Sequence, residues 1–195
     1  MPYPHGCRSG ECGSCKCRLI AGQVRMYPYS PGALSEDERA AGLILACRSR
    51  PAGDVEVAWL GDAAPPAFHS VQPLVARVVR MEAATHDITR LYVEPAGKPL
   101  AFAAGQYANL TFGRLPARPY SMANRPDASV LEFHIRRVPD GLVSTYVAEE
   151  LSIGERIKIE GPYGGAQLRE NPARPMLLVA GGSGLAPMKS ILLAA

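Results

Sequence analysis

The sequence predicts a mostly β chain of the α+β class, built from three successive segments. Four cysteines crowd into residues 7–17, and short apolar runs broken by glycine and proline, with one helical pattern among them, occupy residues 71–166. A buried-strand pattern, a glycine turn and a helical pattern follow. Two stretches without apolar periodicity, "GDAAPPAFHS" at 61–70 and "QLRENPARP" at 167–175, are predicted to be loops or linkers. We therefore expect domains at residues 1–62, 71–168 and 174–195.

The composition is that of a folded protein in water. Hydrophobic residues make up 47% of the 195 residues and charged residues 20%. The net charge of +3 is spread along the chain, which suits an anionic cofactor or partner and is no nucleic-acid signature. No segment has the length of a membrane span, and the start shows no secretory signal. We therefore expect a cytoplasmic protein, in which clustered cysteines indicate metal binding rather than disulfides.

The cysteine-rich stretch "CRSGECGSCKC" follows the pattern C-x4-C-x2-C. Cys7, Cys12 and Cys15 supply three thiols from one loop, and Cys47 supplies a fourth after 31 further residues. This order is the plant-type spacing of a [2Fe–2S] centre, with three ligands from a tight loop and one from elsewhere. Cys17 lies in a strand-like context and is interpreted as a small buried thiol outside the ligand set.

Other uses of the cysteines fit the sequence less well. A structural zinc site more often shows two C-x2-C pairs or a mixture of cysteine and histidine. A disulfide framework conflicts with an odd number of cysteines, and a Rieske centre needs paired histidines where only His5 is at hand. Gly6, Gly10 and Gly13 allow backbone angles that a tight cluster loop requires. The sequence favours [2Fe–2S] and leaves a zinc site or a vestigial site open.

The rest of the first segment predicts short strands around one helix. "CRLIAGQVRM" indicates a strand, a turn and a strand, and "DVEVAWL" a closing strand. Ser35 and Glu38 form a capping-box pattern at the start of a short helix. Together with the cysteine loop, the segment resembles the ferredoxin domain of bacterial multicomponent-oxygenase reductases, which implies a β-grasp sheet. That family places two strands and a helix before the first cluster cysteine, so we expect the N-terminal part of the domain to be missing.

The central segment predicts a small antiparallel barrel. Strand patterns occur in "LVARVVRMEAATHDITRLYVEP", "GQYANLTF", "RPYSMAN", "VLEFHIRRV" and "ERIKIEGPYG". One stretch, "GLVSTYVAEEL", carries apolar residues at helical spacing. Several short strands with a single helix and no alternation of strand and helix favour a barrel over a parallel sheet.

The motif "RPYS" at residues 118–121 carries the chemistry of a flavin site. Tyr120 offers a flat surface for the ring, Ser121 a hydrogen bond to its redox-active edge, and Arg118 a bidentate contact to phosphate. Downstream, "DGLVS" places a helix N-terminus where backbone amides can receive phosphate. We take Tyr120 and Ser121 as the candidate catalytic residues and all three as candidate FAD ligands.

With "GQY" before it and "FHIRRV" and "GLVS" after it, this segment resembles the FAD-binding domain of the ferredoxin–NADP reductase family. The resemblance implies that His134, Ile135 and Arg136 line the flavin site, largely through their backbone. It also implies that Val143 and Ser144 meet the diphosphate. For His134, Ile135 and Arg136 an ordinary structural position in the barrel stays open.

The last segment, "MLLVAGGSGLAPMKSILLAA", predicts a buried parallel strand, a glycine turn and a helix. It resembles the opening strand–helix unit of the pyridine-nucleotide domain of the same family, with "GPYGGA" at 161–166 as the bridge. Gly181, Gly182 and Gly184 are then the candidate NAD(P)H-binding residues, because glycine lets the backbone approach the nucleotide. NADH and NADPH both remain open. We expect the chain to stop after this unit, truncated relative to the family.

Together these patterns predict an electron-transfer oxidoreductase. A nicotinamide releases two electrons as hydride and a [2Fe–2S] cluster accepts one, so a flavin, which handles both, must lie between them. The resemblance implies an oxygenase component or similar acceptor protein as partner. Two alternatives stay open: a cysteine-based metal-binding or interaction module, and an inactive fragment of such a reductase. Five basic residues flank the cysteines and form a candidate docking rim: Arg8, Lys16, Arg18, Arg48 and Arg50.

Overall fold

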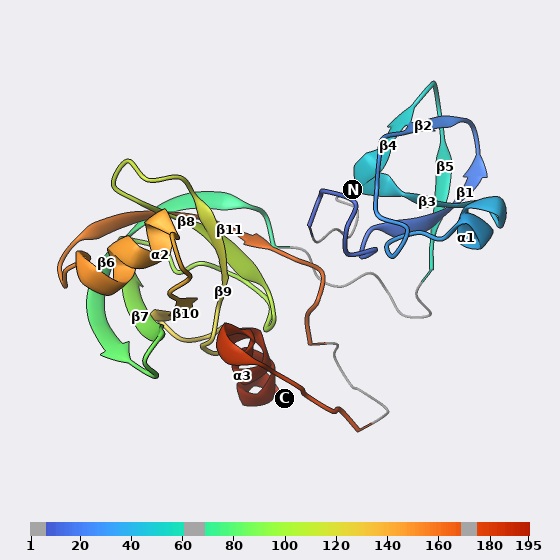
Figure 1. Ribbon diagram of the computed structural model, residues 1–195. Coiled ribbons are helices and arrows are strands. Elements are labelled where there is room, and N and C mark those ends of the chain that lie inside the picture. Colours follow the sequence, from blue (N-terminus) through green and yellow to red (C-terminus); the bar gives the residue numbers. More distant parts are fainter. Residues whose placement is uncertain (1–6, 61–68, 169–174) are drawn as a thin grey trace. The chain divides into compact units, whose positions relative to one another are not determined.

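The computed structural model describes residues 7–60, 69–168 and 175–195 (Figure 1). The chain divides into two compact units, one of Met1–Phe68 with Gly164–Ala166 and one of His69–Tyr163 with Gln167–Ala195. Most of the predicted linker at 61–70 and of the predicted loop at 167–175 lies outside the described residues.

The first unit holds the predicted strands in two small antiparallel groups. A three-stranded sheet has the order β3–β1–β5, from β3 (Leu43–Leu45), β1 (Lys16–Ala21) and β5 (Glu56–Trp59). A separate pair joins β2 (Val24–Met26) to β4 (Ser49–Pro51). The strand–turn–strand prediction for residues 17–26 is confirmed, although β1 and β2 pair with different partners rather than with each other.

The helix of the first unit begins where the sequence predicts. In α1 (Glu36–Ala40) the Ser35 hydroxyl accepts from the Glu38 N–H at 3.2 Å, and the Glu38 carboxylate accepts from the Ser35 N–H at 2.9 Å. This reciprocal capping box satisfies two backbone donors that a helix start leaves without partners. A 3-10 turn, η1 (Ala46–Arg48), follows β3 and carries Cys47. The core of this unit is small and includes Cys15, Ala33, Leu34 and Leu45.

The second unit is an antiparallel barrel, as predicted. Its strands are β6 (Gln72–Ala83), β7 (Ile88–Pro95), β8 (Tyr107–Phe112), β9 (Arg118–Ser121), β10 (Leu131–Arg136) and β11 (Arg156–Tyr163). They follow the order β10–β7–β6–β11–β8–β9. An isolated antiparallel bridge between Met122 and Phe133 brings the two ends of this order together and nearly closes the barrel.

The barrel core follows from alternation along its strands. In β10, Leu131, Phe133 and Ile135 point inward and are 1% exposed or less. The intervening Glu132 and His134 point to the outer face, where they are covered by other parts of the unit. The predicted helix is α2 (Leu142–Glu149), and it packs its apolar face against the core.

The last segment forms its helix but not its strand. η2 (Gly182–Gly184) leads into α3 (Leu185–Ala194), and α3 lies beside β10 (Figure 1). The prediction of a buried strand at residues 176–180 is wrong: no strand forms there, and Leu177 is 89% exposed. A parallel strand needs a neighbour for its hydrogen bonds, and the described residues offer it none. No described helix is long and apolar enough to cross a membrane.

Candidate functional site

The cysteine loop brings its four predicted ligands together as two pairs. The Cys12 sulfur lies 3.4 Å from the Cys7 N–H nitrogen, so the first two ligands are neighbours. The Cys15 and Cys47 sulfur atoms are 3.1 Å apart, although 32 positions separate these residues in the chain. Cys17, in contrast, is fully buried in β1, as the sequence predicts for a thiol outside the ligand set.

Backbone contacts beneath the loop hold the two pairs in place. The Ala46 N–H donates to the Cys15 carbonyl at 3.0 Å, which ties the fourth ligand's segment to the loop. Gly10 has φ +82°, and a Cβ atom built there would lie 2.9 Å from both Arg48 and Tyr29 side-chain atoms. Glycine is therefore needed at this position both for the backbone angle and for the close packing beneath it.

The surroundings of Cys7 and Cys47 shift the pKa values of these two thiols in opposite directions. Partial burial acts to raise the pKa of Cys7, but hydrogen bonds from Ser9 and Glu11 outweigh it and lower that pKa from 9.0 to about 6. Burial and then a hydrogen bond with Cys15 raise the pKa of Cys47 to about 12. A metal that binds Cys47 must therefore displace its proton, whereas Cys7 already favours the thiolate that metals require.

The donor set fits a two-iron cluster better than a single ion. Each iron of a [2Fe–2S] cluster takes two thiolates, and the structure supplies one adjacent pair for each. The Glu11 N–H also donates to the Cys7 sulfur at 3.3 Å, a type of contact that tunes cluster potential.

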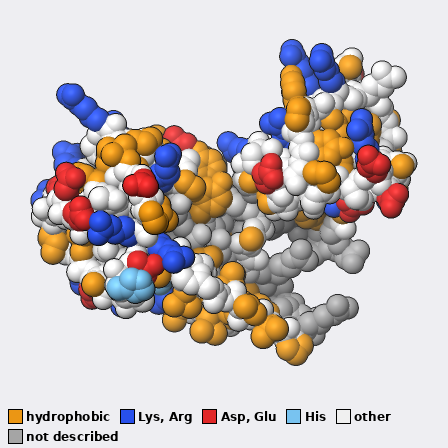
Figure 2. Space-filling view, in the orientation of Figure 1, with side chains coloured by type: hydrophobic (Ala, Val, Ile, Leu, Met, Phe, Trp, Pro, Cys, Tyr) orange, Lys and Arg blue, Asp and Glu red, His pale blue; other side chains and the backbone are white. Residues whose placement is uncertain are grey.

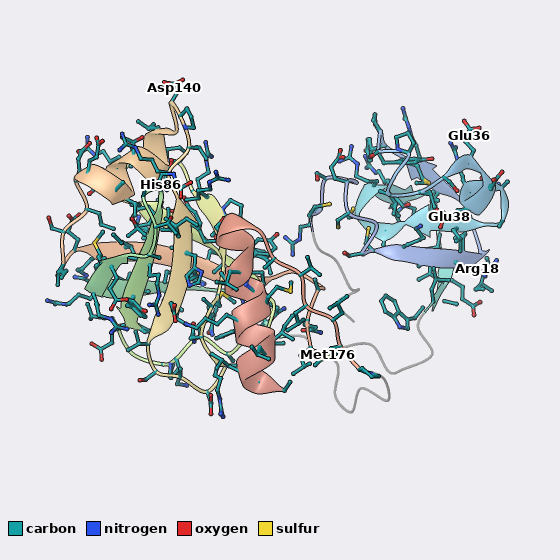
Figure 3. All side chains as sticks on the ribbon, turned by 60° about the horizontal axis from the view of Figure 1, so that its bottom comes forward. Arg18, Glu36, Glu38, His86, Asp140 and Met176 are labelled. Carbon is teal, nitrogen blue, oxygen red and sulfur yellow. The ribbon has the colours of Figure 1, made fainter. Side chains whose placement is uncertain are left out.

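Three residues of the predicted basic rim, Lys16, Arg18 and Arg48, make polar contacts within the first unit. Lys16 pairs with Glu38 of α1, and the Arg18 guanidinium donates to the Ala41 carbonyl at 2.8 Å (Figure 3 labels Arg18 and Glu38). The Arg48 guanidinium donates to the Pro28 carbonyl at 2.9 Å. These residues thus support the fold around the loop. A docking role for the rim remains a prediction.

The predicted flavin residues flank a seam in the barrel, defined here as the gap between β9 and β10. In the described part of the chain the two strands share only the Met122–Phe133 bridge. The Ala123 N–H donates across the same seam to the Glu132 carbonyl at 2.7 Å. The opposite edge of β10 is paired with β7 along its whole length. Apart from this bridge and this hydrogen bond, no backbone pairing between the described residues of β9 and β10 crosses the seam.

Arg118 and Tyr120 come together on one face of β9, whereas Ser121 points to the other. In the register with β8, Tyr120 lies opposite Ala108 and Arg118 opposite Leu110, while Ser121 lies opposite Tyr107. Burial raises the pKa of Tyr120, and the nearby Arg118 charge acts in the opposite direction. Arg118 and Tyr120 thus share one face of β9, Tyr120 packs partly against the barrel core, and Ser121 lies on the other face. Their contact with a flavin stays a prediction.

The three predicted residues of β10 have different surroundings. The Ile135 side chain belongs to the barrel core and is 1% exposed, so it is closed to a ligand. The His134 ring is buried, with Nε2 3.0 Å from Glu132 Oε1. Because the Glu132 carbonyl faces the seam, strand alternation points the backbone groups of His134 and Arg136 the same way. By the same alternation the backbone groups of Ile135 face β7, so this geometry is compatible with a backbone contact from His134 and Arg136 but not from Ile135. The flavin role of these residues stays a prediction.

At the start of α2 the side chains build the turn and leave the amides for a ligand. Val143 is buried in the core. The Ser144 hydroxyl donates to the Gly141 carbonyl at 3.1 Å and accepts from the Val138 N–H at 3.2 Å. A contact with diphosphate would therefore come from the amides of the first helical turn, which have no partners inside the helix.

The glycine turn at residues 181–184 lies beside β10. Gly182 has φ +54°, and a Cβ atom built there would lie 3.7 Å from the Arg136 guanidinium. The structure therefore places a predicted nucleotide residue next to a predicted flavin residue. A Cβ atom at Gly181 or Gly184 would meet open space.

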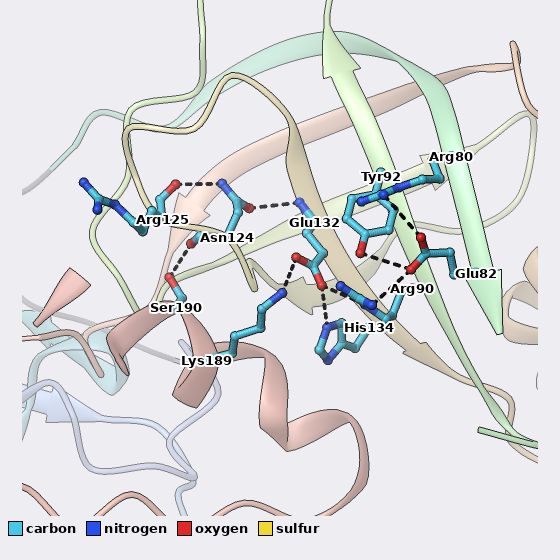
Figure 4. A network of polar contacts seen from close by, with 10 residues as sticks. All are labelled: Arg80, Glu82, Arg90, Tyr92, Asn124, Arg125, Glu132, His134, Lys189 and Ser190. Atoms are coloured by element: carbon cyan, nitrogen blue, oxygen red, sulfur yellow. Dashed lines mark hydrogen bonds and ion pairs between the residues drawn. The ribbon is translucent and has the colours of Figure 1, made fainter. Parts of the chain in front are cut away.

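Glu132 is a central residue that sequence reasoning missed (Figure 4). Its carboxylate accepts from Arg90 at 3.1 Å, from Lys189 of α3, and lies 3.0 Å from the His134 ring. Burial alone would raise its pKa, but hydrogen bonds from His134, Lys189 and Arg90 outweigh burial and lower the pKa from 4.5 to about 2. A single glutamate in a strand carries no signal of this kind, because two of its three partners, Arg90 and Lys189, come from β7 and α3.

The depressed pKa of Glu132 predicts a pH-dependent contribution to stability. The contribution is complete above pH 4.5 and is lost as the pH falls towards about 2, because the unfolded chain then binds the extra proton. We expect the difference in unfolding free energy between the unaltered chain and Glu132→Gln to shrink over this range in urea titrations. Glu94→Gln, which removes an exposed carboxylate of the neighbouring strand β7, is the control. A difference independent of pH would contradict the prediction.

Four cysteines, three from one loop and one from η1, and a nearly closed antiparallel barrel with Arg118 and Tyr120 on one face of β9 suit an iron–sulfur flavoprotein. The family model for a 2Fe-2S iron-sulfur cluster binding domain matches residues 1–52, and that for an oxidoreductase FAD-binding domain matches residues 76–168. These matches confirm the predicted cluster and flavin.

Two relatives and one crystal structure are similar to almost the whole chain. The chain is 43% identical over 188 residues to the ferredoxin–NAD(P)+ reductase component of the naphthalene 1,2-dioxygenase system of Pseudomonas putida, covering 96% of this chain and 56% of that protein. It is 39% identical to the reductase subunit of an aromatic O-demethylase of Amycolatopsis, covering 96% and 58%. The crystal structure of the Amycolatopsis cytochrome P450 reductase GcoB matches with a TM-score of 0.75 and 38% identity, over 98% of this chain and 59% of that one.

The chain carries a 2Fe-2S domain followed by an oxidoreductase FAD-binding domain, and along almost its whole length it is similar to reductase components of oxygenase systems. It spans less than two thirds of the length of these three relatives.

Proposed function

We propose that the protein is a reductase that passes electrons from NAD(P)H through FAD and a [2Fe–2S] cluster to an oxygenase component or a similar acceptor protein. One observation carries the proposal: the same chain holds two pairs of thiols and, beside the barrel seam, Arg118 on the same strand face as Tyr120. Bound FAD accepts two electrons as hydride from a nicotinamide and releases them singly, which matches the one-electron capacity of the cluster.

The chain's own residues have distinct parts in this function. Arg118 neutralises phosphate charge, and Tyr120 offers its ring face to the flavin. The first-turn amides of α2 receive the diphosphate, and the backbone of β10 borders the ring along the seam. The Gly181–Gly184 turn admits the nucleotide beside Arg136. The four cysteines would hold a [2Fe–2S] cluster, which would accept electrons one at a time, and two of them, Cys7 and Cys12, are exposed.

The test is an anaerobic visible spectrum of the purified chain, with iron, zinc and flavin measured on the same sample. We expect flavin bands over a broad iron–sulfur envelope, about one flavin and about two iron atoms per chain. A colourless protein with bound zinc would favour a cysteine-based metal-binding module instead. A colourless chain without metal would identify an inactive form of the reductase.

The proposal also includes a surface at which the acceptor protein docks. The positive side chains beside Cys47 and at the loop are candidates for contact with an acidic acceptor surface, because charge complementarity speeds encounter. Arg50 is the exposed member of this group next to the fourth ligand.

A further inference from the structure

Helix α3 meets the barrel with an unexpected face. Ala186, Ser190 and Ile191 are the buried residues of this helix and are at most 9% exposed. Leu192 and Leu193 point away and are 67% and 46% exposed, and Figure 2 shows hydrophobic side chains gathered over this helix. A helix attached only by the hydrophobic effect would turn its leucines inward. The polar contacts of the helix therefore help to set its orientation, together with the burial of Ala186 and Ile191.

Two consecutive residues of α3 make these contacts. The Lys189 ammonium donates to Glu132 Oε2, and the Ser190 hydroxyl donates to the Asn124 carbonyl at 2.7 Å (Figure 4). The Asn124 side chain in turn accepts from the Glu132 N–H at 2.9 Å. The helix thus hydrogen-bonds to both Glu132 of β10 and Asn124, which follows β9, and these two residues are hydrogen-bonded to each other.

Glu132 is fixed by the barrel independently of the helix. Arg90 of β7 and the His134 ring both reach Oε1, the carboxylate oxygen that Lys189 does not use. The glutamate side chain is only 7% exposed. Because these partners remain when Lys189 is replaced, removing the lysine leaves no unpaired buried carboxylate, and the contact with the helix can be tested alone.

We propose that Glu132 is a positioning residue that latches α3, through Lys189, to the outer face of β10. The latch sets where the glycine turn sits along the strand, because η2 leads directly into α3 and Gly182 lies against Arg136. By this route the latch fixes the nucleotide-binding turn relative to the backbone that borders the flavin. That consequence rests on the proposed function, whereas the latch itself does not.

The test is hydrogen–deuterium exchange on the full chain as purified, comparing the unaltered protein with Lys189→Met. We expect the α3 amides to exchange about tenfold faster in the variant, the loss that follows from removing one charge-assisted hydrogen bond. Amides of β7 and β11 should keep their protection, because the barrel is untouched. Lys98→Met, at an exposed lysine between β7 and β8, is the matched control and should leave α3 unchanged.

Two further variants separate the latch from simple helix propensity. Lys189→Arg should restore the protection of α3, because a guanidinium also donates to a carboxylate. Glu132→Gln and Lys189→Met combined should accelerate exchange by less than the product of their separate effects, since both break one interaction.

Unchanged exchange of α3 in Lys189→Met, or failure of Lys189→Arg to restore protection, would overturn the latch. Exchange reports on the helix whatever cofactors are bound. An unaltered chain that takes up neither iron nor FAD would therefore overturn the proposed function and leave the result for the latch standing.

Discussion

Replacing Cys47 with serine is expected to remove the iron from the protein, whereas replacing Cys17 with alanine should leave it in place. Cys47 and Cys15 form the second thiol pair, with sulfurs 3.1 Å apart, so its loss leaves one iron with a single thiolate. Iron content should fall from about two per chain to near zero, and the broad visible envelope should vanish. Iron analysis and absorbance measure both.

The control residue, Cys17, lies in β1, the strand that follows the cysteine loop. Cys17 is buried and lies two residues after a predicted ligand, so it matches the ligands in chemistry and in distance along the chain. Flavin content should stay unchanged in both variants, because the barrel is a separate unit. Retained iron in Cys47→Ser, or lost iron in Cys17→Ala, would show that the ligand set is wrong.

Local chemistry explains what the sequence predicts well. The spacing of Cys7, Cys12 and Cys15 is a property of one loop, and the capping box of Ser35 and Glu38 needs only three residues of separation. The barrel strands show their alternation in the sequence because one face of each is buried in the core. In each case the signal can be read within one short segment, even where, as in the strands, the burial that causes it involves the rest of the barrel.

Non-local partners explain what the sequence predicts poorly. The apolar run at residues 176–180 has the composition of a buried strand, but a strand exists only where a neighbour pairs with it. Glu132 is bound by residues 42 and 57 positions away, so no window of sequence shows its role. Its position in an alternating strand even suggests a solvated side chain. Burial by α3, which brings Lys189, reverses that expectation.

Arg118 illustrates the same limit at the flavin site. Its motif predicts the chemistry, and the structure adds that its side chain shares a face with Tyr120 while Ser121 takes the other face. A cation next to an aromatic surface suits a ligand that joins a flat ring to phosphate. The division of the motif between two faces implies that arginine and serine contact different parts of such a ligand.

Arg118→Gln should therefore weaken FAD binding by about tenfold or more, because one charge-assisted phosphate contact is worth a factor of this size. Titration of the flavin-free chain with FAD, followed by fluorescence, measures the dissociation constant. Arg114→Gln, at an exposed arginine just before β9, is the control for lost positive charge and should bind FAD as tightly as the unaltered chain.

Arg118→Lys then distinguishes charge from geometry. A lysine keeps the charge but not the planar fork, so affinity between those of the unaltered chain and Arg118→Gln would indicate bidentate recognition of phosphate. Affinity equal to that of the unaltered chain would reduce the role to a point charge. If Arg118→Gln itself binds FAD with unchanged affinity, the arginine is a structural residue of β9, and the diphosphate must rely on the amides of α2 alone.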